Sequence, residues 1–382
     1  MEDCCRSFET KVVHGNGYKS KTGAVSIPIY QTATFQHPAL GQSTGYDYSR
    51  LQNPTREEVE KTVALLEGGK EGMAFSTGMA GITCLFSLFK PGDHIILSDD
   101  LYGGTYRIME ELFKVYGVEA DYVDASYIEL VKKAVKPNTK AIYIETPTNP
   151  MMKISDISAI AALAKEIGAI TIVDNTFMTP HFQKPFEYGA DIVVHSGTKY
   201  LGGHNDTLAG FIVVKDNEEL ISRLRLLQKS IGSVLSPFDS WLILRGIKTL
   251  SIRMEKQQEN ALKIADFLSK HSKVKKIYYP GLESHLGYEI QKKQSTGFGA
   301  MISFEVNSEE TVEKILEKVD LIMFAESLGG VETLITYPYR QTHADVPEDI
   351  KNSLGITKKL LRLSVGIEKA EDIIADLQAA ME

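Results

Sequence analysis

A lysine preceded by two hydroxyl side chains follows a strongly apolar stretch near the middle of the chain. Residues 192–194 are β-branched and typical of a buried strand, and Ser196, Thr198 and Lys199 come directly after them. Hydroxyls and an amine at a strand end can hold a small anion, and a desolvated lysine can form a Schiff base with an aldehyde. The alternative is that Lys199 merely ends a strand in solvent. An isolated Ser-x-Thr-Lys segment usually has that structural role.

Polar residues at the ends of other apolar runs favour the chemical interpretation. Asp174 ends the run 170–174, Asn149 lies in the turn after another run, and Tyr102 lies on a glycine-containing loop after a third. A fixed carboxylate keeps a pyridine nitrogen protonated, which makes the ring of a cofactor such as pyridoxal phosphate an electron sink, and a tyrosine ring can stack on it. Each feature taken singly is more often part of a turn, but together they point to one site.

A phosphate site is indicated further upstream. Gly78 and Met79 stand at the start of the helical run 80–89, where backbone amides bind phosphate. The helix dipole contributes only about 0.3–1 kcal/mol at an exposed site, which is too little for a doubly charged group. We therefore expect Ser196, Thr198 and a guanidinium to complete the cradle.

The elements that must position these residues alternate between strand-like and helical patterns from residue 71 to about 215. Strands are expected at 94–98, 118–123, 141–145, 170–174, 192–195 and 211–214, and helices at 80–89, 103–116, 127–135 and 155–167. This alternation predicts an α/β fold with a largely parallel sheet, in which ligands bind at the carboxyl ends of the strands.

The rest of the chain divides around this region. Residues 1–60 form a polar, irregular arm, 61–235 the large cofactor-binding domain, and 236–382 a C-terminal α/β domain that begins with a long helical stretch over 236–270. Within the arm, Tyr48 and Arg50 either reach a neighbouring subunit's site or lie in a solvated loop.

Composition excludes several classes of function. The 382 residues are 43% hydrophobic and 24% charged, with a net charge of -8, which gives no electrostatic footprint for nucleic acid or an anionic membrane. Cys4, Cys5 and Cys84 are an odd number without disulfide spacing, so we expect a reducing, cytoplasmic setting without a signal or membrane-spanning segment. No metal-ligand spacing occurs among the histidines, and no metal is expected.

Several segments together resemble the pyridoxal-phosphate transsulfuration family, which includes cystathionine γ-synthase, γ-lyase and β-lyase and methionine γ-lyase. The matching segments span nearly the whole chain: 48–50 with 53–56, 76–79, 102–105, 145–150, 173–176, 195–199, 326–330 and 361–366. The resemblance implies the fold of type I aminotransferase-like enzymes, with a large, mostly parallel sheet domain and a smaller C-terminal α/β domain. It also implies an amino-acid substrate and a homotetramer, a dimer of dimers with active sites shared across the dimer interface.

The family's residue roles carry over by position. The catalytic residues would be Lys199 as Schiff-base lysine and proton shuttle, Tyr102 as stacking ring, and Asp174 as partner of the pyridine nitrogen. The other cofactor-binding residues would be Gly78, Met79, Thr176, Ser196 and Thr198, with Tyr48 and Arg50 from the adjacent subunit. Substrate binding would fall to Arg362, Ser327, Asn149, Asp47, Arg107 and Glu326.

The resemblance favours cystathionine γ-synthase, which joins an O-acyl-homoserine to cysteine. Gly104 stands where methionine γ-lyases usually carry cysteine, and the segments 335–338 and 341–347 look like those of bacterial γ-synthases. Cystathionine γ-lyase is the next possibility and β-lyase follows. A catalytically silent binding protein with this fold is the alternative outside enzymes, and surface charges are the alternative for Asp47, Arg107 and Glu326.

Overall fold

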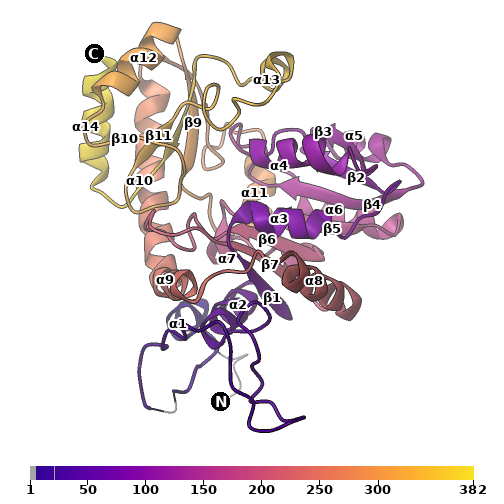
Figure 1. The fold of residues 1–382 in the computed structure, drawn as a ribbon. Coiled ribbons are helices and arrows are strands. Elements are labelled where there is room, and N and C mark those ends of the chain that lie inside the picture. The colour runs from indigo at the N-terminus through magenta and orange to yellow at the C-terminus, as the bar shows by residue number, and fades with distance from the viewer. Residues whose placement is uncertain (1–5, 21) are drawn as a thin grey trace.

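The computed structural model describes residues 6–20 and 22–382, and two sheets organise them (Figure 1). The larger has seven strands in the order β1-β7-β6-β5-β4-β2-β3, and the smaller has five in the order β10-β11-β12-β9-β8. Cys4 and Cys5 lie outside the described residues, and Cys84 is a buried free thiol. Among the described residues, no helix is long and apolar enough to cross a membrane.

The large sheet is formed by strands β1 (Glu71–Phe75), β2 (His94–Ser98), β3 (Glu119–Val123), β4 (Thr139–Glu145), β5 (Ile170–Asp174), β6 (Ile192–Ser196) and β7 (Gly210–Val214). The pairs from β3 to β6 are parallel, whereas β7 runs antiparallel to both β6 and β1. The expected mostly parallel α/β sheet is therefore confirmed, with one reversed strand. Its carboxyl ends bring Glu145, Asp174 and Ser196 to one edge, because β4, β5 and β6 are neighbours.

Helices cover both faces of this sheet, as its alternating buried residues require. Along β5, Ile172 packs into one core cluster and Val173 into another, since successive side chains point to opposite faces. Helices α3 (Gly78–Phe86), α4 (Gly103–Ile108) and α8 (Glu218–Ile231) contribute to the first cluster, and α2 (Pro54–Glu67) and α6 (Ile157–Glu166) to the second. Shorter segments complete the layers: α5 (Ile128–Ala134), α7 (Thr179–Phe182), and the π- and 3₁₀-helical turns Met109–Phe113 and Pro185–Tyr188.

The smaller sheet consists of β8 (Val274–Tyr278), β9 (Met301–Val306), β10 (Met323–Phe324), β11 (Leu334–Thr336) and β12 (Leu360–Ser364). The accompanying helices are α10 (Leu250–Lys270), α11 (Tyr288–Gln294), α12 (Glu309–Lys318), α13 (Glu348–Leu354) and α14 (Ala370–Met381). All of its pairings are antiparallel except that of β10 with β11. Strand β12 is central, so Arg362 projects from a fully buried strand.

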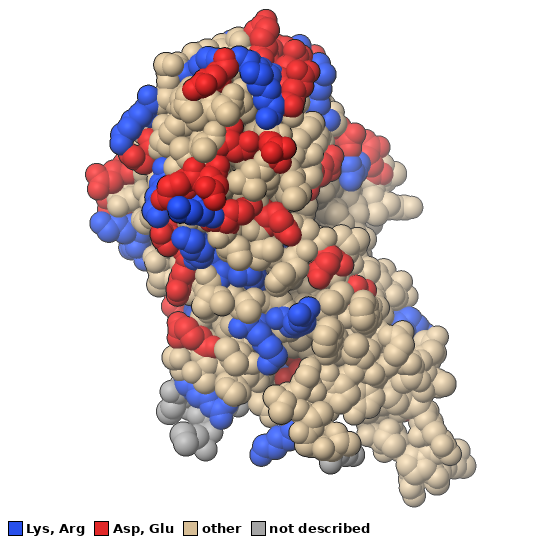
Figure 2. Space-filling view, turned by 90° about the vertical axis from the view of Figure 1, so that its left-hand side faces the viewer, with Lys and Arg blue, Asp and Glu red and all other residues tan. Residues whose placement is uncertain are grey.

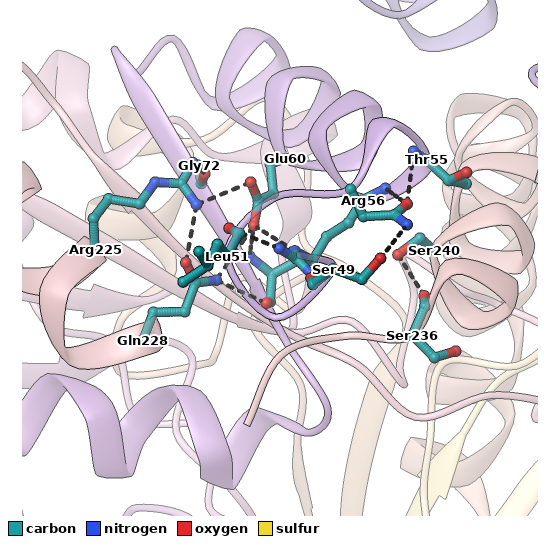
Figure 3. A network of polar contacts seen from close by, with 12 residues as sticks. Ser49, Leu51, Thr55, Arg56, Glu60, Gly72, Arg225, Gln228, Ser236 and Ser240 are labelled. Carbon is teal, nitrogen blue, oxygen red and sulfur yellow. Dashed lines mark hydrogen bonds and ion pairs between the residues drawn. The ribbon is translucent and has the colours of Figure 1, made fainter. Parts of the chain in front are cut away.

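The N-terminal segment contains helix α1 (Phe8–His14) and otherwise extends at the bottom of the view in Figure 1. A polar network fixes its end (Figure 3). The buried Arg56 donates to the backbone oxygens of Ser49, at 2.5 Å, and Leu51, at 3.0 Å, and lies beside Glu60. Glu60 in turn accepts from Arg225 of α8 at 2.9 Å. The loop at residues 49–51 is thus tied to two helices.

The structure corrects two of the expected elements. The helical stretch over 236–270 is two helices, α9 (Pro237–Ile247) and α10, because the backbone leaves helical geometry at Thr249 with φ -113° and ψ 11°. The helix expected over 103–116 ends its regular part at Ile108 and continues as a π-helical turn. Helix α8 and strand β8 were not anticipated, since their charged residues mask the apolar pattern, and strand β1 was not anticipated either.

Candidate active site

A cavity of about 350 Å³ lies where the carboxyl ends of the large sheet meet the segment before β11 and strand β12. Residues predicted from distant parts of the sequence line it together: Gly78, Met79, Tyr102, Asn149, Asp174, Thr176, Ser196, Thr198, Lys199, Glu326, Ser327 and Arg362. A larger cavity of about 870 Å³ lies elsewhere, between α2, β1 and α8, and contains none of these side chains.

The Lys199 amine is held inside the cavity in a form that loses its proton readily. Its Nζ donates to the Ser327 hydroxyl at 2.7 Å. Burial and, second, the positive charge of Arg362 lower the pKa of Lys199 to about 8 from the ordinary value of 10.5. Ser327 itself has a positive φ of 88°, which is unusual for a residue with a side chain. An amine with this pKa is a competent nucleophile and base near neutral pH.

Asp174 provides a carboxylate at the opposite strand end. It accepts from the Thr176 backbone amide at 3.0 Å and from the Tyr143 hydroxyl at 3.2 Å. Burial raises the pKa of Asp174, although the hydrogen bonds from Thr176 oppose that effect. Glu145 lies close enough for each carboxylate to disfavour ionisation of the other, and burial raises the pKa of Glu145 well above its ordinary value. A protonated heterocyclic nitrogen facing Asp174 would relieve this unfavourable burial.

The other end of the cavity is built to receive an anion. Helix α3 begins at Gly78, capped by the Thr77 hydroxyl, which accepts from the Ala80 amide at 3.0 Å. A Cβ on Gly78 would come within 3.1 Å of the Ser196 Cβ, so glycine keeps this approach open. The Thr176 hydroxyl accepts from the Ser196 amide at 2.9 Å and holds the two strand ends together. Backbone amides and hydroxyls at a helix start suit a phosphate.

Arg362 is oriented as a fork for a carboxylate. One guanidinium nitrogen donates to the Asn149 side-chain oxygen at 2.8 Å, and the other to the Ser327 backbone oxygen at 3.0 Å and the Thr336 hydroxyl at 3.1 Å. Burial lowers the pKa of Arg362 to about 10, and its buried Nε has no protein partner among the described residues. A substrate carboxylate would supply the missing negative charge.

Tyr102 stands at the mouth of the cavity, where 40% of its surface is exposed. Its backbone amide donates to the Glu145 carboxylate at 3.0 Å, which fixes the loop against the sheet. A Cβ on Gly104 would lie 2.5 Å from the tyrosine ring, so glycine leaves the ring free to lie over the cavity. The ring is therefore placed to stack on a flat ligand.

Four predicted residues lie outside this cavity within the single chain. Asp47 accepts from Ser43 at 2.9 Å in the arm, and Arg107 forms an exposed ion pair with Asp345. Tyr48 is 43% exposed, and Arg50 donates to the Lys229 backbone oxygen at 2.6 Å.

Sequence reasoning overlooked several residues that line the cavity or support it. Glu145 was recognised as part of a strand end but not as a neighbour of Asp174, although its position after an apolar run carried that signal. His195, Phe177 and Leu208 also contribute. Thr342 reaches the cavity from a loop far along the chain, and no local pattern announces it.

The cavity fits pyridoxal phosphate. It combines an amine of lowered pKa, a buried carboxylate of raised pKa, an aromatic ring at the mouth and a helix start kept open by Gly78. These are the features that the aldehyde, the ring nitrogen, the ring face and the phosphate of this cofactor require. Fold and cavity together define a pyridoxal-phosphate-dependent enzyme.

Comparison with known proteins specifies the family. Residues 9–382 match the model of the Cys/Met metabolism PLP-dependent enzymes, and the chain belongs to that family. It is 53% identical to a cystathionine γ-lyase of Bacillus subtilis (98% of this chain, 99% of the relative) and 53% identical to a cystathionine β-lyase of Lactococcus lactis, with the same coverage. A cystathionine γ-synthase structure from Xanthomonas oryzae pv. oryzae, solved with aminoacrylate and cysteine, superposes with a TM-score of 0.96 at 40% identity over 98% of both chains.

The protein is thus a pyridoxal-phosphate-dependent transsulfuration enzyme of the cystathionine γ-synthase, γ-lyase and β-lyase group. The expected fold class, family and cofactor are confirmed. The names of its relatives are mixed, so they do not distinguish among the three activities.

Proposed function

We propose that the main reaction is that of a cystathionine γ-synthase: replacement of the acyloxy group of an O-acyl-homoserine by the thiol of cysteine. The observation that carries this proposal is Glu326, an exposed carboxylate at the cavity wall directly before Ser327. Its charge acts on both Lys199 and Arg362, which supports a role near the reacting end of a bound amino acid. A carboxylate there attracts the ammonium group of the cysteine that enters in the replacement.

Roles follow for the other residues. Bound pyridoxal phosphate would supply the electron sink that makes the α-proton of the amino acid acidic. Arg362, oriented by Asn149, would bind the substrate carboxylate, and Asp174 would face the ring nitrogen. The freed amine of Lys199 would remove the α-proton and move protons along the side chain, held in reach by the Ser327 hydroxyl. The thiol would then take the γ-position that the acyloxy group leaves as a carboxylate.

Cystathionine γ-lyase is the second candidate because a γ-lyase is among the relatives at 53% identity. It shares the early proton transfers, and it would release cysteine, 2-oxobutyrate and ammonia from cystathionine. Cystathionine β-lyase is third, also with a 53% relative. A binding protein without catalysis is disfavoured because Lys199, Asp174, Tyr102 and Arg362 are all present around one cavity.

The test is product analysis with the purified enzyme and added cofactor. We expect cystathionine from cysteine plus O-acetyl- or O-succinylhomoserine, and no keto acid from cystathionine alone. Release of 2-oxobutyrate and cysteine from cystathionine would favour the γ-lyase, pyruvate with homocysteine would indicate the β-lyase, and no product in any mixture would favour the silent protein. Glu326→Gln should raise the KM for cysteine more than that for the homoserine ester, and Glu332→Gln, an exchange of another carboxylate of the same segment that does not line the cavity, should change neither.

We also propose that two chains share their active sites and that dimers pair into a homotetramer. Lys199 and Arg362 are the lysine and arginine lining the cavity within the described chain, and each already has a side-chain partner, Ser327 for Lys199 and Asn149 for Arg362. Arg50 of a second chain would supply the guanidinium for the phosphate, with Tyr48 beside it, and Asp47 and Arg107 would contribute at the substrate side.

Two features of the arm support this assembly. Arg56 holds both carbonyl groups that flank Arg50, which presents that side chain from a fixed loop (Figure 3). Val25 and Leu40 are fully exposed in the chain alone, and the visible surface at the bottom of Figure 2, at the height of the arm, is mostly uncharged. An arm with exposed apolar side chains of this kind is stabilised by packing on another surface. The cytoplasmic location stays a prediction.

A further inference from the structure

A buried acidic and basic pair lies at the same strand ends as the cofactor carboxylate. Nε2 of His195, in β6, is 2.5 Å from Oε1 of Glu67, the last residue of α2. The two side chains are 1% and 0% exposed. No part of the proposed mechanism uses either residue, and Glu67 does not line the cavity.

Amide groups connect this pair to the residue after Asp174. The Asn175 side chain donates to the same oxygen of Glu67 at 2.9 Å and to the Gln183 backbone oxygen at 2.9 Å. Gln183 donates back to Asn175 at 3.1 Å and to the Thr146 backbone oxygen at 3.1 Å. The network therefore joins the ends of β4, β5 and β6, which carry Glu145, Asp174 and Ser196.

The arrangement is unfavourable for stability alone. Glu67 lies at the carboxyl end of α2, where the helix dipole disfavours a negative charge, and that last turn has no basic residue. Oε2 of Glu67 and Nδ1 of His195 are buried without a protein partner among the described residues. Well-packed apolar residues often stabilise a protein as much as a buried ion pair does. A role beyond stability accounts better for a pair kept in this position.

The charge of this pair reaches Asp174. Among the groups that act on Asp174, His195 is the one that contributes a positive charge, and that charge lowers the pKa of the carboxyl against the effect of burial. Val194, directly before His195, is paired with Asp174 between β6 and β5, and Oε1 of Glu67 holds the imidazole at 2.5 Å. The other polar groups around Asp174 are Tyr143 and Thr176, both neutral, and Glu145, whose charge acts in the opposite direction.

We propose that Glu67 and His195 are positioning residues that keep a positive charge behind Asp174 and so hold it as a carboxylate toward the cofactor ring. The inference rests on the proposed role of Asp174. According to this proposal, Glu67 at the end of α2 influences proton transfer at the substrate although it contacts neither the cofactor nor the substrate.

The experiment compares the holoenzymes of Glu67→Gln and His195→Gln with the wild type. We expect kcat to fall about tenfold or more in each variant, which corresponds to a change of one unit in the pKa of Asp174. The KM for the homoserine ester should change less than twofold because Arg362 is untouched. The absorbance of the bound cofactor, titrated with pH, should shift in the same direction in both variants. Glu67→Asp, which keeps the charge, should recover part of the loss.

Controls separate this inference from the role on which it rests. Glu58→Gln replaces another buried carboxylate of α2 and should leave kcat and the absorbance titration unchanged. The double variant of Glu67 and His195 should be no slower than His195→Gln alone, because the two act as one unit.

The inference would be overturned if Glu67→Gln and His195→Gln had the absorbance titration and the kcat of the wild type. It would also be overturned if they lost no more activity than Glu58→Gln. If Asp174→Asn changes the titration and these variants do not, only the positioning role fails. If Asp174→Asn also has no effect, the proposed role of Asp174 fails first. Should Glu67→Gln not fold, His195→Gln decides alone, with thermal unfolding of the apoenzyme as the check on stability.

Discussion

At the scale of single residues, the site depends on groups whose ordinary charge states are disfavoured by burial. Lys199, Asp174 and Arg362 each have a pKa shifted toward the neutral form, with burial as the first cause. Ligand charges of opposite sign would remove that penalty on binding. The chemistry and the affinity for a charged cofactor and substrate thus come from the same unfavourable burial.

The pKa of Lys199 gives a prediction on the pH dependence of cofactor attachment. Only the unprotonated amine attacks an aldehyde, so the rate of Schiff-base formation by the apoenzyme should rise with pH and level off above about pH 8. An ordinary lysine would continue to gain rate up to about pH 10.4. Stopped-flow absorbance with pyridoxal phosphate measures this profile.

Arg362→Gln is the matched variant for that prediction. Removing this positive charge raises the pKa of Lys199, so the plateau should move to higher pH, whereas Lys263→Gln on the surface should not move it. A wild-type profile that still rises steeply at pH 9.5 would contradict the assigned environment of the amine.

At the scale of elements, the anion site depends on how closely α3 approaches the end of β6. Gly78 allows this approach, because a side chain there would meet Ser196 at 3.1 Å. Three positions later, a Cβ on Gly81 would lie 3.4 Å from the Phe75 ring and 3.9 Å from Ile212, which are ordinary contacts. The close approach of α3 to β6 therefore requires glycine at position 78 but not at position 81.

We predict that Gly78→Ala weakens pyridoxal phosphate binding by roughly tenfold, the loss of about one hydrogen bond to a charged group. Pyridoxal, which has no phosphate, should react with Lys199 of this variant at the wild-type rate. Fluorescence titration of the apoenzyme measures the affinities.

Gly81→Ala is the control on the same helix. It should keep the affinity and stabilise the protein by up to about 1 kcal/mol, because alanine loses less backbone entropy in a helix. Equal losses of affinity in both variants would mean that helix packing, rather than access to the phosphate, explains the effect.

At the scale of the whole molecule, function requires two sheets and, as we propose, two chains. The large sheet supplies Lys199 and Asp174. In the smaller sheet, Ser327 lies in the segment before β11, and Arg362 lies within β12. We propose domain boundaries near residues 60 and 235, which place the arm, the large domain and the C-terminal domain around one cavity. Relative movement of the two sheets would change the contact between Lys199 and Ser327.

Subunit complementation tests the shared site. Lys199→Ala and Arg50→Ala should each be nearly inactive as pure proteins. When the two are co-expressed with different tags, random pairing gives half mixed dimers with one intact site each, so about a quarter of the wild-type activity should return.

The control for this experiment is a mixture of Lys199→Ala with Asp174→Ala, two residues that line the same cavity of one chain. Their mixed dimers contain no intact site, and no activity should return. Failure of the first mixture to recover activity, with mixed dimers demonstrated by tandem purification, would place Arg50 at its own chain's site or at none.

The sequence by itself determined the α/β class, the family and the cofactor. Apolar runs such as 170–174 and 192–195 specify strands locally, and the polar residues at their ends must lie at the sheet edge because parallel strands end on the same side. Only the tertiary structure decided that Asn149 and Ser327 orient Arg362, that Glu145 lies beside Asp174, and that Glu67 pairs with His195. These contacts join residues as many as 213 positions apart, so side-chain packing rather than local periodicity selects them.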